Sequence, residues 1–185
     1  MSFSSLKISS KEIFYLPNVL TYLRLLSLPL IYNFLVKENL LAVGLLTLLG
    51  ISTDIFDGIL ARKFNKASNL GKILDPLVDK IAIGIFAIYA VIYKDFPFWA
   101  ACFVILKDLL ILVAGLVALN KFKEFPVSNL WGKLTAMAWA LTILSYILNL
   151  KSIKEILLVA GLTLTLFSSI SYLKKFLLQL KINKL

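Results

Sequence analysis

The sequence contains no histidine and a single cysteine among its 185 residues. The lack of histidine excludes histidine as a general base, and with it the Ser-His-Asp and Cys-His arrangements and the usual zinc sites. One cysteine, Cys102, leaves no second thiol for a disulfide framework. Any chemistry must therefore use carboxylates, hydroxyls, lysines, arginines or hard metal ions.

Charge is also scarce, since 16% of the residues are charged and 60% are hydrophobic. An average soluble domain has about 25% charged residues, which cover its core with a polar surface. This chain has too few polar residues for a water-soluble globule and too many apolar residues for a disordered chain. The composition indicates an integral membrane protein that crosses the bilayer several times.

The apolar runs predict an all-α membrane protein with six transmembrane helices in a single domain, residues 1–185. The expected spans are residues 18–36, 39–62, 70–93, 97–119, 128–148 and 153–176. Residues 8–16 mix apolar and charged side chains and end at Pro17, which predicts a short amphipathic helix on the membrane surface.

The net charge of +10 is distributed unevenly along the chain. Most lysines and Arg62 lie at the span ends that share a side with the two termini, and the opposite ends hold Lys37, Lys94, Lys151 and Lys154. Positive charge stays on the cytoplasmic side, so both termini are expected in the cytoplasm. We expect a bacterial, archaeal or equivalent organelle membrane, anionic membrane lipids as partners, and no nucleic acid.

The acidic residues are concentrated, because four of the six aspartates are Asp54, Asp57, Asp75 and Asp79. The first two are three residues apart and the last two are four apart, so each pair shares one face of a helix. A short polar stretch, residues 63–69, separates the pairs and predicts two antiparallel neighbouring helices. The four carboxylates can then converge near the cytoplasmic surface.

Three explanations of these aspartates remain open on spacing alone. Carboxylate oxygens select hard cations, and two such ions are typical of displacement at phosphorus. The carboxylates can instead form internal salt bridges with Arg62, Lys72 and Lys80, or line a proton or ion pathway. Gly58 and Gly71 beside them serve either close helix packing or close approach of a ligand.

The aspartates belong to a longer pattern, Asp54-x2-Asp57-Gly58-x2-Ala61-Arg62-x8-Gly71-x3-Asp75-x3-Asp79. This pattern resembles the signature of the CDP-alcohol phosphotransferase (CDP-alcohol phosphatidyltransferase) family. The stretch Asn18-x2-Thr21-x2-Arg24 is similar to the opening motif of that family, and residues 74–80 most resemble its phosphatidylglycerophosphate synthases and cardiolipin synthases. The segment 128–135 matches a further family motif at Gly132-Lys133, with altered spacing on both sides.

The resemblance implies a six-helix membrane enzyme, usually a homodimer, that moves a phosphatidyl group from CDP-diacylglycerol to an alcohol and releases CMP. It implies two divalent cations, Mg²⁺ or Mn²⁺, held by Asp54, Asp57 and Asp75 with Asp79 close to one of them. Asp79 would be the catalytic base. The residues implied for CDP binding are Asn18, Thr21, Asp54, Gly58, Ala61, Arg62 and Gly71.

The acceptor alcohol is less well indicated by the sequence. Arg24, Lys107 and Lys133 form a candidate pocket for an acceptor phosphate, although Lys107 can equally pair with Asp108 and Lys133 can reach the interface. Glycerol 3-phosphate is the expected acceptor, a small phosphorylated alcohol. The alternatives are phosphatidylglycerol, as in cardiolipin synthases, and inositol phosphate or serine. A cation transporter with intramembrane carboxylates is the alternative from a different class of protein.

Overall fold

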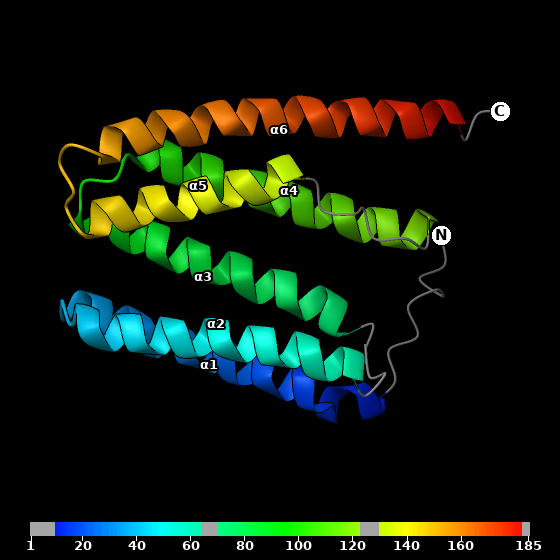
Figure 1. Cartoon of the computed structure of the whole chain (residues 1–185), viewed down its shortest axis with the longest axis horizontal. Coiled ribbons are helices and arrows are strands. Elements are labelled where there is room, and N and C mark those ends of the chain that lie inside the picture. Colours follow the sequence, from blue (N-terminus) through cyan, green and yellow to red (C-terminus); the bar gives the residue numbers. More distant parts are fainter. Residues whose placement is uncertain (1–9, 64–69, 123–129, 183–185) are drawn as a thin grey trace. The chain divides into compact units, whose positions relative to one another are not determined.

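A computed structural model describes residues 10–63, 70–122 and 130–182, with side chains described except at 10–11, 55, 57–63, 72, 114–122 and 172–182. Within these ranges the chain forms one short 3-10 helix and six α-helices (Figure 1). In chain order they are η1 (Ser10–Phe14), α1 (Leu16–Val36), α2 (Leu40–Lys63), α3 (Gly71–Tyr93), α4 (Phe98–Phe122), α5 (Leu130–Ile147) and α6 (Lys154–Ile182).

Each of the six predicted spans corresponds to one α-helix, so the all-helical prediction is confirmed. The ends agree within a few residues, except that α6 continues to Ile182. Four helical segments in the described part of the chain are long and apolar enough to cross a membrane: Leu16–Val36, Ile73–Tyr93, Leu130–Ile147 and Lys154–Ser171. Within the described side chains, α2 contributes a shorter apolar segment, Leu40–Asp54.

The short helix predicted over residues 8–16 is confirmed in part, and residues 8–9 lie outside the described residues. The described part of this segment is the five-residue 3-10 helix η1, which ends at Phe14. Tyr15 is extended and precedes α1, which begins at Leu16 with Pro17 in its first turn. Proline is tolerated there because the first backbone N–H groups of a helix have no intrahelical acceptor, so Pro17 does not separate the two elements.

Three helix connections use a residue with left-handed backbone in place of glycine. Glu38, Asp95 and Asn149 have φ angles of 55°, 55° and 54° and follow α1, α3 and α5. After α1, the N–H of Asn39 donates to the carbonyl of Phe34 at 3.0 Å, which closes the helix end. The Asn39 side chain then accepts from the N–H of Ala42 at 3.1 Å and caps α2.

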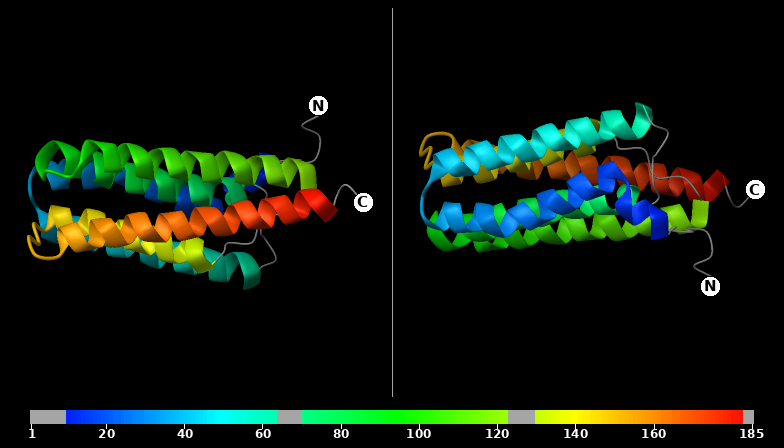
Figure 2. Two further views of the ribbon diagram at one scale, coloured as in Figure 1. Left: turned by 90° about the horizontal axis from the view of Figure 1, so that it is seen from above. Right: turned by 90° about the horizontal axis from the view of Figure 1, so that it is seen from below.

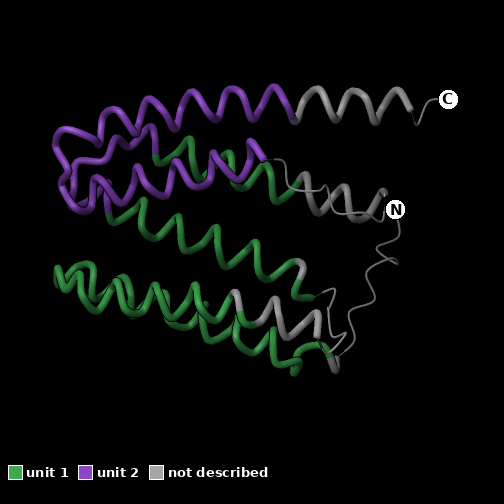
Figure 3. The backbone as a smooth tube through the Cα atoms, viewed as in Figure 1, with its two compact units in different colours: residues 1–89, 101–125 green, residues 90–100, 126–185 purple. Residues whose placement is uncertain are grey.

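The chain divides into two compact units (Figure 3). The first comprises residues 1–89 and 101–125, and it contains α1, α2 and most of α3 and α4. The second comprises residues 90–100 and 126–185, and it contains the α3–α4 connection, α5 and α6.

In the first unit, α1 packs against α2, and the buried residues of α1 recur at spacings of three, four or seven residues along one stripe. The buried residues of this stripe are Asn18, Thr21, Leu28, Ile31 and Leu35. The stripe is therefore polar near the start of α1 and apolar toward its end. Gly50 of α2 lies beside Arg24, since a Cβ atom at Gly50 would be 3.9 Å from Cγ and Cδ of Arg24. The polar half of α1 thus faces the part of α2 that leads into the aspartates.

In the second unit, α5 and α6 lie side by side (Figures 1 and 2) and are joined by hydrogen bonds between the helices. Thr142 Oγ1 donates to the carbonyl of Leu157 at 3.0 Å, and Trp139 Nε1 donates to Thr165 Oγ1 at 2.9 Å. Gly161 allows this approach, because a Cβ atom there would be 3.4 Å from the Trp139 ring. Small residues and hydroxyls are the usual means of packing helices where no water is present.

Candidate active site

Three of the predicted metal-ligand aspartates surround one arginine in the first unit. Arg24 Nη1 on α1 donates a hydrogen bond to Asp54 Oδ1 on α2. The same nitrogen is 3.6 Å from Asp79 Oδ1, and Nη2 is 3.9 Å from Asp75 Oδ1, both on α3. The Arg24 side chain is 11% exposed, whereas those of Asp54, Asp75 and Asp79 are 44%, 43% and 57% exposed. The carboxylates thus form an accessible cluster over a buried guanidinium.

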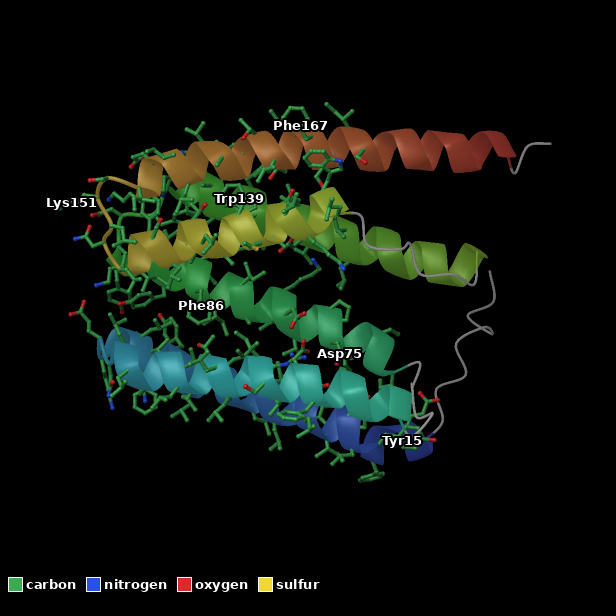
Figure 4. The ribbon with its side chains drawn as sticks, viewed as in Figure 1. Tyr15, Asp75, Phe86, Trp139, Lys151 and Phe167 are labelled. Carbon is green, nitrogen blue, oxygen red and sulfur yellow. The ribbon has the colours of Figure 1, made fainter. Side chains whose placement is uncertain are left out.

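Figure 4 shows Asp75 on α3, in the first unit with α1 and α2. Its Oδ1 accepts a hydrogen bond of 2.8 Å from Thr21 Oγ1, and the same hydroxyl approaches the carbonyl of Pro17 at 3.1 Å. Thr21 is 1% exposed. The sequence predicts that Thr21 takes part in CDP binding, and in the structure its hydroxyl contacts Asp75. The buried Thr21 hydroxyl therefore orients the Asp75 carboxylate.

The segment before α1 is linked to the start of α3. Glu12 Oε2 accepts a hydrogen bond of 3.1 Å from the N–H of Leu70, immediately before Gly71 begins α3. The backbone carbonyl of Glu12 accepts from Asn18 Nδ2 at 2.6 Å, and Asn18 is buried. Sequence reasoning missed this link, because nothing in the local pattern around Glu12 identifies an amide 58 residues away.

For several other predicted site residues, the structure describes the backbone but not the side chain. Asp57, Gly58, Ala61 and Arg62 lie on α2 after Asp54, and their side chains are outside the described residues, as is that of Lys72. Gly71 is buried at the first position of α3.

The residues of the predicted acceptor pocket fall in both compact units, and the pocket stays a prediction. Arg24 lies among the carboxylates, and Lys107 on α4 donates to Asp108 at 2.5 Å. Lys133 is exposed on α5, in the second unit. The pairing of Lys107 with Asp108 is the alternative that the sequence left open for this lysine.

The aspartate cluster has the donor atoms that a divalent cation needs. Within the described side chains, no three His, Cys, Asp or Glu residues are arranged to hold one ion. The donor chemistry fits a hard cation, because Asp54, Asp75 and Asp79 offer only carboxylate oxygen. Their three formal negative charges exceed the single positive charge of Arg24. The excess negative charge and the exposure of the carboxylates leave the cluster suited to a divalent cation.

Residues 14–167 of the chain match the CDP-alcohol phosphatidyltransferase family. The chain belongs to this family. The matched range includes Phe14 of η1, all of α1 to α5 and about the first half of α6, so it contains the whole aspartate cluster. The resemblance seen in the aspartate pattern is thereby confirmed, and the protein is a membrane-lipid transferase of this enzyme class.

Individual relatives agree with this assignment. The chain is 35% identical over 168 residues to a CDP-diacylglycerol–glycerol-3-phosphate 3-phosphatidyltransferase of Aquifex aeolicus, covering 86% of this chain and 94% of that protein. It is 37% identical over 172 residues to a protein of the same name from Rickettsia typhi, covering 86% and 95%. A cardiolipin synthase (CMP-forming)/mitochondrial hydrolase fusion protein of Schizosaccharomyces pombe is 36% identical over 116 residues, which cover 63% of this chain and 19% of that protein.

Proposed function

We propose that the protein transfers the phosphatidyl group of CDP-diacylglycerol to glycerol 3-phosphate and releases CMP. The observation that carries the proposal is the cluster of Asp54, Asp75 and Asp79 around Arg24, in a chain that matches phosphatidyltransferases over nearly their whole length. The relatives named for this reaction support glycerol 3-phosphate as the acceptor.

Some of the site residues are proposed to bind the metal ions and CDP, and one is proposed to transfer the proton. Asp54, Asp57 and Asp75, with Asp79 nearby, would hold two divalent cations, Mg²⁺ or Mn²⁺. These ions, when bound, supply positive charge for the pyrophosphate and for the CMP leaving group. Asn18, Thr21, Gly58, Ala61, Arg62 and Gly71 complete the proposed CDP site, and Thr21 acts there by orienting Asp75.

Asp79 is the proposed general base, because it has the most exposed of the three described carboxylates in the cluster. It takes the proton from the acceptor hydroxyl as the hydroxyl oxygen attacks the phosphorus that carries the diacylglycerol. The new bond joins that phosphorus to the acceptor oxygen. The bond to the CMP oxygen breaks, and CMP leaves with the electron pair.

The site is proposed to lie at the cytoplasmic boundary of a six-helix membrane domain. At 1.5 Å per residue, Asp54 lies about 20 Å along α2 from Leu40. A hydrocarbon core is about 30 Å thick, so Asp54 lies roughly two thirds of the way across it, in the half that leads to the cytoplasmic boundary. There the nucleotide stays in water while the acyl chains stay in lipid.

Exposed apolar side chains support the membrane position. Large examples in the described residues are Leu26, Leu41, Leu106 and Ile156, with exposed fractions from 59% to 76%. A water-soluble protein rarely exposes so many, whereas lipid is their natural solvent. Both termini are proposed to be cytoplasmic, and the active form to be a homodimer, as the resemblance implies.

The test is an acceptor screen on purified protein with CDP-diacylglycerol and Mg²⁺ or Mn²⁺, following CMP release. The acceptors are glycerol 3-phosphate, phosphatidylglycerol, inositol phosphate and serine. CMP release with glycerol 3-phosphate is expected, and chelation of the metal with EDTA should abolish it. Release with phosphatidylglycerol alone would replace the proposed acceptor by the one that the cardiolipin synthase relative suggests. Cation flux without CMP release would favour a transporter.

A further inference from the structure

Arg24 on α1 joins carboxylates of α2 and α3 in the first unit. One of its terminal nitrogens, Nη1, donates to Asp54 Oδ1 and lies 3.6 Å from Asp79 Oδ1. The other, Nη2, lies 3.9 Å from Asp75 Oδ1. A single guanidinium is thus shared by three carboxylates from two other helices. The mechanism proposed above gives this cation no part.

The Arg24 side chain packs against α2. It is 11% exposed, and a Cβ atom at Gly50 would lie 3.9 Å from its Cγ and Cδ. Gly50 is one turn before Asp54 on the same face of α2, so the arginine stem passes the glycine and the guanidinium reaches the carboxylate. An ionised group with so little exposure is costly unless opposite charges lie beside it. The carboxylates of the cluster supply those charges.

The aspartate cluster carries more negative than positive charge. Asp54 and Asp75 repel the charge on Asp79. Arg24 and Lys80 attract it, and Lys80 Nζ also lies 3.5 Å from a carboxylate of α4. Among the described side chains, the three aspartates exceed the two cations by one negative charge, even if Lys80 is counted in full. Removal of Arg24 would raise this excess to two and leave α2 and α3 repelling each other.

A divalent cation would meet the charge of Arg24 at the same carboxylates. The Oδ1 atoms of Asp54, Asp75 and Asp79 lie within 4 Å of the guanidinium nitrogens, and carboxylate oxygens are the ligands that such a cation needs. Like charges repel, and the repulsion is stronger where water is partly excluded. Arg24 therefore has two opposite effects, because it stabilises the carboxylates while no cation is bound and weakens the binding of a cation.

We propose that Arg24 is a positioning residue that acts as the internal counter-ion of the aspartate cluster. It holds Asp54 of α2 beside Asp79 of α3 before a divalent cation binds, and it competes with the cation for these carboxylates. The inference rests on the proposed function, which places the metal ions at these aspartates. It deepens that proposal, because it names the residue that keeps the site assembled and sets its affinity for the metal.

The first experiment measures Mn²⁺ binding to purified protein without donor or acceptor, from the EPR signal of free Mn²⁺. A unit charge within about 4–6 Å of a carboxylate changes its affinity for a proton by about ten- to a thousand-fold. Mn²⁺ carries twice the charge of a proton, so Arg24→Gln should lower the Kd for Mn²⁺ by about ten-fold or more. Arg24→Lys keeps the charge and should remain within about three-fold of wild type.

Lys37→Gln is the matched control for this titration. It removes the same charge from the same helix, at the exposed C-cap of α1, far along the chain from the cluster. Its Kd for Mn²⁺ should stay within about two-fold of wild type. An Arg24→Gln Kd equal to or higher than that of wild type would overturn the proposal.

The second experiment compares thermal unfolding in detergent with EDTA and with Mn²⁺. Arg24→Gln should have a lower Tm than wild type in EDTA, because its carboxylates repel one another. A cation that binds only the folded protein stabilises it more when its Kd is lower, so Mn²⁺ should raise the Tm of Arg24→Gln by more than that of wild type. A loss of Tm that is the same in EDTA and in Mn²⁺ would indicate a packing role and contradict the counter-ion.

A double variant keeps the test available if Arg24→Gln does not fold in EDTA. Arg24→Gln combined with Asp79→Asn removes one charge of each sign, so it should be more stable in EDTA than Arg24→Gln alone. Arg24→Gln combined with Asp95→Asn is the control, because it removes an exposed carboxylate outside the cluster and should restore nothing. Equal stabilities of the two double variants, or failure of both to fold in EDTA and in Mn²⁺, would overturn the proposal.

Neither experiment uses turnover, so the two proposals fail in different ways. If wild type releases no CMP with any acceptor, the proposed function fails, and the role of Arg24 is still decided by the Kd for Mn²⁺ and the Tm. If wild type releases CMP and Arg24→Gln binds Mn²⁺ no more tightly than wild type, the function stands and the counter-ion is overturned.

Discussion

Thr21 Oγ1 on α1 lies 2.8 Å from Asp75 Oδ1 on α3 and donates to it. The relationship connects the two motifs of the sequence that carry the family resemblance, the opening motif and the aspartate pattern. Arg24, one turn further along α1, reaches Asp54 and Asp79 from the same side. The first turns of α1 therefore form the support on which the carboxylates of α2 and α3 are arranged.

Replacement of Thr21 by valine should lower catalytic efficiency without unfolding the protein. Valine keeps the shape of threonine and removes the donor to Asp75. The lost hydrogen bond contributes about 1 kcal/mol, which corresponds to a roughly five-fold lower rate of CMP release. The measurement is kcat/KM for CMP release. Thr163→Val is the matched control, because the Thr163 hydroxyl is exposed and donates to Ala160 on its own helix. Equal effects of the two substitutions would contradict a positioning role for Thr21.

Asp79→Asn should abolish turnover and leave donor binding largely intact. Asparagine cannot accept the acceptor proton, and removal of a general base costs about 10²–10⁴-fold in rate. The measurements are CMP release and equilibrium binding of CDP-diacylglycerol. Loss of donor binding would show that Asp79 acts mainly as a metal ligand. Asp95→Asn, in the α3–α4 connection, should retain full activity.

Glu12→Ala should destabilise the start of α3. The Glu12 carboxylate accepts from the Leu70 N–H, next to the first turn of α3, and loss of such a cap costs about 1 kcal/mol. Thermal unfolding in detergent should show a lower Tm for Glu12→Ala. Glu12→Gln keeps an acceptor oxygen and should lose less. If alanine and glutamine variants both unfold at the wild-type temperature, the link has no energetic role.

Gly161→Leu should separate α5 from α6 and lower the free energy of unfolding. A Cβ atom at Gly161 already reaches 3.4 Å from the Trp139 ring, so alanine fits and a branched side chain does not. Overpacking of this kind costs roughly 1–3 kcal/mol. In detergent, the free energy of unfolding should be similar for wild type and Gly161→Ala and lower for Gly161→Leu. Gly44→Leu is the control, since nothing lies within 4 Å of a Cβ atom there, and a matching loss in that variant would remove the packing explanation.

Much of the fold was predictable because each helix depends on a local property. Long apolar runs and polar breaks predict α1 to α6 within a few residues. The short helix over residues 8–16 was predictable only in part, because the structure has the 3-10 helix η1 over Ser10–Phe14 and Pro17 lies inside the first turn of α1. The residue types of the site were also predictable, since four aspartates in an apolar chain are conspicuous.

The sequence by itself determined that this is a helical membrane-type protein of the CDP-alcohol phosphatidyltransferase family, with a hard-ion chemistry based on aspartate. Only the tertiary structure decided which charges meet. It paired Arg24 with Asp54, Lys80 with Asp108, and Glu12 with the amide of Leu70. The physical reason is that helix formation follows from neighbouring residues, whereas ion pairs depend on how packed helices are rotated and aligned. That alignment brings Lys80 of α3 to Asp108 of α4.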